Sequence, residues 1–248
     1  MNKVSRFSLS AVEKSLNKLK EENNKNEFIE ILSFVNQLKR DEADNRIKDV
    51  IYSLGRVHQF ELVNNIIKKT GYQINSNNSI MDLFFDTNKC NYYFHKLSDS
   101  GYEIVNIQDR RDDNSFISPS ETLVFSFPWN KQRMIDAFKE IGEAVGNKWE
   151  HQPINHKVCL IKPLNIAVIE NGYHSSSINI ITNESPFKVT SCLDLTPIYN
   201  EIFTDGVYFF DKKSSTKLAP VRSVEMAAIF EIGRIILDDS EKALDIDS

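Results

Sequence analysis

A glycine, a histidine and three consecutive serines lie within residues 172–177, and these residue types can bind an anion or move a proton. Glycine lets a ligand approach the backbone, and serine hydroxyls donate hydrogen bonds. Histidine titrates near neutral pH, so His174 can donate to an anion or act as a general acid or base. This segment is therefore the first place to look for chemistry.

The pattern around this segment predicts a strand, a tight turn and the start of a helix. The apolar run Ile166–Ile169 is typical of a buried strand, and Asn171-Gly172 is a turn signal. A helix N-terminus presents up to four unpaired N–H groups and about half a positive charge, which can hold a phosphate or a carboxylate. The sequence therefore predicts an anion site at the turn.

The predicted site combines one acid–base group with several anion ligands. His174 is the candidate catalytic residue. The candidate binding residues share a polar side chain or an open backbone close to the turn in sequence: Gly172, Ser175, Ser176, Lys162 and Glu170. In the alternative, purely structural interpretation, Asn171-Gly172 only reverses the chain and a serine caps the helix.

The order of strand, Gly-x-His turn and helix resembles the phosphate-binding turn of the ParB/sulfiredoxin-like fold. The resemblance covers Leu164–Ile181 and implies contact with nucleotide phosphates or a DNA-related ligand. In that fold an arginine typically follows the histidine, whereas Ser175 stands here. This departure removes the strongest phosphate contact that the motif offers.

The C-terminal half is also similar to an uncharacterised bacterial and phage family of unknown function. The similarity rests on Pro163-Leu164, on the turn Gly172–Ser175 and on the helical motif Ile229–Arg234. This resemblance implies a shared fold and names no activity.

A metal site is a second chemical interpretation of the histidines. His151, His156 and His174 lie within 24 residues, and Asp194 or Glu170 could add an oxygen ligand for zinc. No two of these histidines have a ligand spacing on a predicted regular element, so we predict no metal site. The sequence names no cofactor.

Composition limits the classes of protein that fit. The chain has 248 residues, 41% of them hydrophobic, which is enough for a sizeable core, and its net charge of −5 gives no basic field for nucleic acid. Three widely spaced cysteines without a Cys-x-x-Cys pattern are typical of a reducing compartment. No apolar run approaches about 18 residues, so we expect no membrane contact and a cytoplasmic location.

The hydrophobic periodicity predicts an α+β fold. We expect a mostly helical region with one or two strands over residues 1–150, followed by a small mixed β-sheet domain with flanking helices over residues 151–248. Four helical stripes joined by short polar segments are predicted in the first part: Leu9–Leu19, Phe28–Leu38, Ile47–Leu54 and Phe60–Ile67. The last of these helices is expected to end at Gly71, and a strand is expected over Tyr102–Ile107.

A further helix is predicted after Asn130, which has the residue type of an N-cap. Its expected inner face comprises the apolar residues that recur at helical spacing: Met134, Ile135, Phe138, Ile141 and Val145.

Two classes of function fit these observations. The first is a bacterial or phage protein that binds a nucleotide or another phosphate-bearing ligand, linked to nucleotides or nucleic acid, through the anion site; whether it is an enzyme stays open. The second is a non-enzymatic interaction module, such as a regulator, an inhibitor or a phage-defence component. In that case the N-terminal helices would bind a protein partner or form a homodimer.

Overall fold

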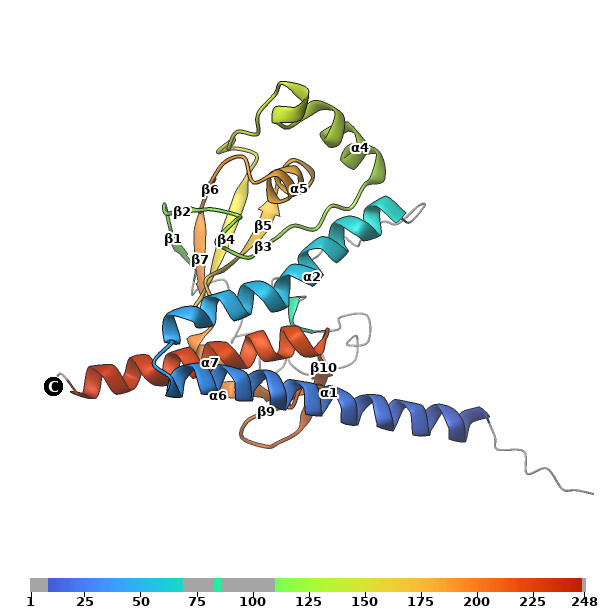
Figure 1. Ribbon diagram of the computed structural model, residues 1–248, viewed down its shortest axis with the longest axis vertical. Coiled ribbons are helices and arrows are strands. Elements are labelled where there is room, and N and C mark those ends of the chain that lie inside the picture. The colour runs from blue at the N-terminus through green and yellow to red at the C-terminus, as the bar shows by residue number, and fades with distance from the viewer. Residues whose placement is uncertain (1–8, 69–82, 86–109, 247–248) are drawn as a thin grey trace, which may run out of the picture.

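The computed structural model describes residues 9–68, 83–85 and 110–246, and it confirms a mixed α+β fold (Figure 1). Three long helices form one layer, and a β-sheet with two shorter helices lies beyond it. The long helices are α1 (Leu9–Arg40), α2 (Ile47–Lys68) and α7 (Val224–Ile246). The predicted helix end at Gly71 and the predicted strand Tyr102–Ile107 lie outside the described residues.

The N-terminal region contains fewer and longer helices than the sequence predicts. The stripes Leu9–Leu19 and Phe28–Leu38 belong to one 32-residue helix, α1, and the next two stripes belong to α2. The predicted polar joints inside these helices are therefore wrong. No proline interrupts either helix, and Gly55 is accommodated within α2 because it lies against the side chain of Leu123. Only the joint at residues 41–46 is real, and it includes a short 3-10 helix, η1 (Asp44–Arg46).

The central sheet has five strands in the order β1-β7-β4-β5-β3. Its strands are β1 (Arg110–Asp112), β3 (Val124–Phe125), β4 (Lys157–Lys162), β5 (Ile166–Asn171) and β7 (Ser191–Asp194). β4 runs antiparallel to β5 and parallel to β7, β3 is parallel to β5, and β1 is antiparallel to β7. The sheet is therefore mixed, with β4 at its centre.

Both faces of this sheet are buried, which explains why its central strands are continuous apolar runs. Successive residues alternate between two cores. Cys159 and Ile161 of β4 join the core formed with α1, α2 and α7, while Val158 and Leu160 join a second core on the other face. The second core also contains Trp149.

Shorter elements complete the described part of the chain. They are α4 (Lys131–Glu140), η5 (Glu143–Val145), α5 (Tyr173–Thr182), α6 (Thr196–Glu201), and the strands β2 (Phe116–Ile117), β6 (Phe187–Lys188), β8 (Ile202–Thr204), β9 (Tyr208–Asp211) and β10 (Lys217–Pro220). β2 pairs with β6, and β8, β9 and β10 form a three-stranded antiparallel sheet.

The predicted cap of α4 is confirmed, because the Asn130 side chain accepts a hydrogen bond from the Arg133 N–H. The predicted inner face is wrong in part. Met134 is buried, but Ile135 and Phe138 are exposed. The helix ends at Glu140, so Ile141 and Val145 lie beyond it: Ile141 is partly buried against the core, and Val145 is exposed.

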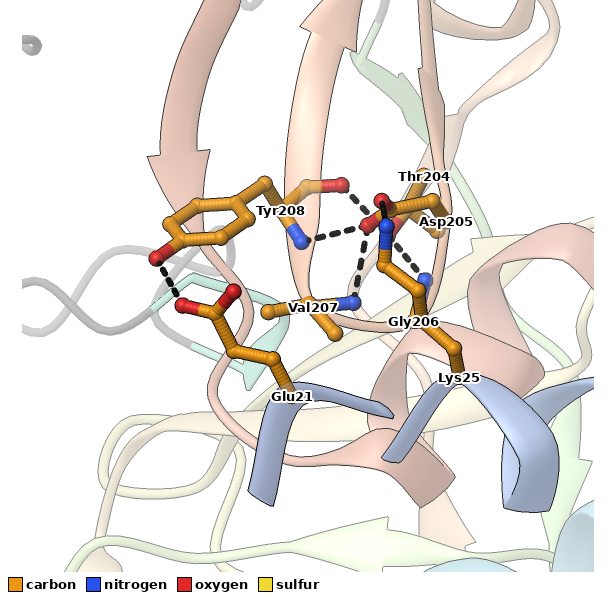
Figure 2. A network of polar contacts seen from close by, with 7 residues as sticks. All are labelled: Glu21, Lys25, Thr204, Asp205, Gly206, Val207 and Tyr208. Carbon is orange, nitrogen blue, oxygen red and sulfur yellow. Dashed lines mark hydrogen bonds and ion pairs between the residues drawn. The ribbon is translucent and has the colours of Figure 1, made fainter. Parts of the chain in front are cut away.

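The hairpin that joins β8 to β9 lies against α1 (Figure 2). Lys25 Nζ lies 2.7 Å from Asp205 Oδ2, and the Tyr208 hydroxyl donates to Glu21 Oε1 at 2.8 Å. Asp205 also accepts hydrogen bonds from the backbone N–H groups of Val207 and Tyr208. The same carboxylate thus stabilises the turn and fixes it to the helix.

The packing crosses the predicted division at residue 150. β1 and β3 precede this position, yet they pair with β7 and β5, which follow it. α7 packs against both α1 and α2. The division into two domains stays a prediction.

Among the helices within the described ranges, none combines the length and the apolar composition that crossing a membrane requires.

Candidate functional site

The predicted strand–turn–helix is present and lies where β5 leaves the sheet. Gly172 adopts φ +79°, a left-handed conformation that favours glycine. A Cβ atom at this position would lie 2.4 Å from the His156 ring and 3.1 Å from the Asn155 carbonyl oxygen. Both the backbone conformation and the close approach of the 155–156 loop therefore require glycine here.

The N-terminus of α5 has no side-chain cap. The first N–H to bond back to the turn is that of Ser176, which donates to the Gly172 carbonyl at 2.9 Å. The N–H groups that precede it in the first turn are left for water or a ligand, and the helix dipole gives them a partial positive charge. This is the feature that the sequence predicts for an anion site.

His174 bridges from α5 to the start of α4. Its Nε2 atom accepts a hydrogen bond from the backbone N–H of Asn130 at 3.2 Å, and its ring meets the edge of Trp129 at a centroid distance of 5.6 Å. Burial, followed by the nearby charge of Arg133, holds the pKa of His174 below its ordinary value. The ring is therefore neutral at pH 7, and its Nδ1–H is the group that can donate to a ligand.

A cavity of about 410 Å³ opens between α4 and α5 at this point. Arg133 lies with its guanidinium carbon 5.0 Å from the centroid of the Trp129 ring, and both residues line the cavity. The remaining lining residues come from the two helices, the turn and one loop: Asp136, Ala137, Glu140, Ile141, Asn155 and residues 171–175. The cavity thus joins a cation, an aromatic ring, two carboxylates and a helix N-terminus.

The hydroxyl of Ser175 is held within the turn. His156 accepts a hydrogen bond at Nδ1 from the Gln152 N–H at 2.8 Å, which places its proton on Nε2. That nitrogen lies 2.8 Å from Ser175 Oγ, and Ser175 in turn donates to the Gly172 carbonyl at 3.1 Å. His156 is therefore a donor to the serine rather than a base that activates it.

The other two serines lie inside the molecule. Ser176 and Ser177 are fully buried, and neither lines the cavity. Ser177 donates to the Tyr173 carbonyl at 2.7 Å, while Ser176 Oγ has no hydrogen-bond partner among the described residues. Of the three serines, only Ser175 borders the predicted anion site.

The structure separates Lys162 from the turn. In the antiparallel pair of β4 and β5, Lys157 lies opposite Asn171, whereas Ile161 lies opposite Ile166. Lys162 is therefore at the far end of β4 from Gly172. Glu170 is the penultimate residue of β5. Burial of Tyr173 raises the pKa of that tyrosine, and the negative charge of Glu170 raises it further.

The structure brings Trp129 and Arg133 to the turn, and the sequence interpretation did not include them. Both lie about 40 residues earlier in the chain, at the start of α4. The Asn130 cap was the signal available, because it places a helix N-terminus directly after β3.

The three clustered histidines are not arranged as metal ligands. Both ring nitrogens of His156 are occupied by Gln152 and Ser175, and Nε2 of His174 is occupied by Asn130. Within the described ranges, no group of three or more His, Cys, Asp or Glu residues could hold a metal ion.

Comparison with models of protein families shows to which family the chain belongs. A model of a family of unknown function, DUF6710, matches residues 13–243. The chain belongs to the DUF6710 family. This agrees with the likeness to an uncharacterised family that the C-terminal motifs indicate. Comparison of this DUF6710 protein with curated proteins found no match, and comparison with solved structures found none. The resemblance to the ParB/sulfiredoxin-like fold gains no support from these comparisons.

Proposed function

We propose that this DUF6710 protein binds a phosphate-bearing ligand of the nucleotide class in the cavity between α4 and α5. The observation that carries the proposal is the convergence of the uncapped N-terminus of α5 and the Arg133 guanidinium on one cavity. Amide N–H groups at a helix N-terminus and an arginine guanidinium both bind phosphate in many proteins.

The rest of the lining favours a nucleotide over a bare phosphate. The volume of about 410 Å³ is in the range of small-molecule sites. Asp136 and Glu140 would oppose a second phosphate close to them, but their oxygens can accept hydrogen bonds from sugar hydroxyl groups. Trp129 adds an apolar wall, and the neutral His174 offers Nδ1–H as a donor.

The Gly-x-His turn supports the same class of ligand, through its resemblance to the phosphate-binding turn of the ParB/sulfiredoxin-like fold. Ser175 stands where that fold has an arginine. In this protein Arg133 brings a guanidinium to the same cavity from α4, which compensates for the missing side chain. In this proposal His174 binds the ligand as a donor and is the residue available for proton transfer.

Isothermal titration calorimetry with a panel of mononucleotides and inorganic phosphate tests the proposal. Arg133→Gln should weaken the binding of the best nucleotide at least about tenfold, because a charge-assisted hydrogen bond is lost. Lys139→Gln is the matched control, since it removes an exposed positive charge from the same helix outside the cavity. Absence of binding by any nucleotide, or equal losses in both variants, would overturn the proposal.

A second function, docking of a protein partner or a second copy, is favoured by the surface of the N-terminal helices. Leu16, Leu19 and Phe34 of α1 are each more than half exposed, at 59%, 58% and 58%. A groove of about 940 Å³ between α1 and α2 is lined by Phe34 and by partly buried apolar residues. Mass measurement in solution tests this: Phe34→Glu should dissociate a complex, whereas Ile154→Glu, at a 91% exposed loop position, should not.

A further inference from the structure

A second cavity lies at the opposite edge of the central sheet, beside β1 and β6. Its volume is about 280 Å³. The lining residues come from the end of β1, the loop before β4, and the chain around β6: Asp112, Asp113, Asn114, His151, Pro153, Lys157, Lys188, Val189 and Thr190. The cavity between α4 and α5 shares none of these residues.

His151 lines this cavity and belongs to an aromatic cluster. Its ring centroid is 5.5 Å from that of His156 and 6.2 Å from that of Trp149. Both ring nitrogens of His151 are buried, and neither has a hydrogen-bond partner among the described residues. A neutral imidazole has one donor and one acceptor, and buried polar atoms of this kind are nearly always satisfied. His151 therefore has an unused donor beside the cavity, which an anion oxygen can contact once the side chains that cover the ring move aside.

Two lysines supply positive charge at the same place. Lys157 and Lys188 both line the cavity. Burial is the main cause of the lowered pKa of His151, and the charges of Lys188 and Lys157 lower it further. Lys157 Nζ donates to the Pro153 carbonyl at 2.7 Å, which holds it at the loop. Within the described part of the chain, Lys188 forms no ion pair, so its charge is free to meet a ligand.

The two carboxylates of the cavity differ in their engagement. Hydrogen bonds from Ser115, first from its side chain and then from its backbone N–H at 2.7 Å, lower the pKa of Asp113. The Asp113 carboxylate is therefore stabilised by a residue of its own turn, and its negative charge is partly balanced by Lys162. Asp112 also lines the cavity and is exposed. Neither carboxylate is paired with Lys188.

We propose that this second cavity binds a small oxyanion, a phosphate or a carboxylate. Lys157 and Lys188 provide the counter-charge, and the N–H of His151 donates to an anion oxygen. The cavity is smaller than usual sites for drug-sized molecules, which favours an ion or a compact metabolite over a nucleotide. The site is independent of the proposed nucleotide cavity.

Nuclear magnetic resonance of the histidine rings tests this proposal in the full chain, with inorganic phosphate and acetate as separate probes. We expect one of them to move the His151 ring signals to saturation. Lys188→Gln should weaken that binding about tenfold, because a charge-assisted hydrogen bond is lost. Lys212→Gln, which removes an exposed charge beyond β9, and Arg133→Gln, which alters the nucleotide cavity, should leave it unchanged.

His151→Phe provides a second variant, which keeps an aromatic ring in the cluster and removes both nitrogens. This variant should abolish binding of the probe that binds the wild-type protein more tightly. The rest of its spectrum should remain that of a folded protein. The proposal would be overturned if neither probe moves the His151 signals. It would also be overturned if the signals move without saturation and move equally in Lys188→Gln. Loss of binding in Arg133→Gln would likewise contradict it, because the effect would then belong to the other cavity.

Discussion

Phe28 of α1 packs directly onto Gly206, the glycine of the turn between β8 and β9. A Cβ atom at Gly206 would lie 2.5 Å from Phe28 Cβ, so the Phe28 side chain occupies the space that any other residue would need. Asp205, the residue before Gly206, forms an ion pair with Lys25 of the same helix (Figure 2). Together these contacts fix the middle of a long helix to a hairpin nearly 180 residues away in sequence.

Gly206→Ala should lower the free energy of unfolding by about 2–4 kcal/mol, because it forces Phe28 aside and places a side chain at φ +85°. Urea denaturation measures this difference. Gly146→Ala is the matched control: Gly146 has φ +75°, but nothing lies within 4 Å of its added Cβ, so only about 1–2 kcal/mol of backbone strain is expected. Equal losses in the two variants would contradict a packing role for Phe28.

Asp205→Asn should remove a pH-dependent part of the stability. Burial disfavours the charged carboxylate, but hydrogen bonds from Lys25 and from the Tyr208 and Val207 N–H groups outweigh it, so the pKa of Asp205 is lowered. A lowered pKa stabilises the fold above the ordinary value of 3.8, and this contribution is lost as the pH falls through the lowered value. Asparagine can keep the turn but loses the ion pair.

We expect Asp205→Asn to cost about 1 kcal/mol at neutral pH, because the pair is partly exposed, and to cost little in strong acid. Urea denaturation of both proteins across the acid range measures the difference. Lys25→Met should have a similar effect at neutral pH, and the double variant should lose less than the sum. Additive losses would show that the two side chains act separately.

Local signals in the sequence predict the strand–turn–helix well. The apolar run of β5 and the turn signal Asn171-Gly172 each act through neighbouring residues, and α5 begins at Tyr173 as this pattern indicates. Continuity of α1 could not be predicted in the same way. Its polar stretch between Leu19 and Phe28 is compatible both with a joint and with an exposed helix, and contacts with the distant hairpin at Gly206 decide between them.

The composition of the cavity depended on tertiary contacts. Arg133 reaches the turn because β3 pairs in parallel with β5, which brings the start of α4 beside α5. Spacing along the chain carries no information about that pairing. The same limit explains Lys162, which is close to Gly172 in sequence but is placed at the other end of β4 by the antiparallel register.

His156 should make the fold less stable in mild acid. Burial, followed by the neighbouring His151, lowers the pKa of His156 from 6.5 to about 4. The unfolded chain takes up the proton at the ordinary value, so this contribution is complete above pH 6.5 and is lost as the pH falls towards about 4. The change should amount to about 2–3 kcal/mol.

Urea denaturation between these pH values measures the effect in wild type and in His156→Gln. The variant should be less stable at neutral pH, since the bonds to Gln152 and Ser175 are disturbed, and its stability should depend less on pH. His174→Gln removes a different histidine. In this variant the free energy of unfolding should keep the larger part of its dependence on pH. A slope that is unchanged in His156→Gln would assign the pH dependence to other groups.

Arg234→Lys should destabilise the fold although it conserves charge. The Arg234 guanidinium donates to Glu231 Oε2 at 2.8 Å, to the Ile202 carbonyl at 2.6 Å and to the Tyr199 carbonyl. Glu231 is 8% exposed and also accepts from the Thr204 N–H, so its charge depends on this arginine. An ammonium group cannot reach all three acceptors, and a loss of about 2–4 kcal/mol is expected.

The matched control for this prediction is Arg46→Lys. Arg46 Nε lies 2.7 Å from Asp49 Oδ2, but the two side chains are 68% and 46% exposed, so the substitution should change the free energy of unfolding by less than about 0.5 kcal/mol. Urea denaturation of both variants compares a buried guanidinium fork with an exposed ion pair. A small loss in Arg234→Lys, similar to that of Arg46→Lys, would show that α7 is held to α6 and β8 by apolar packing alone.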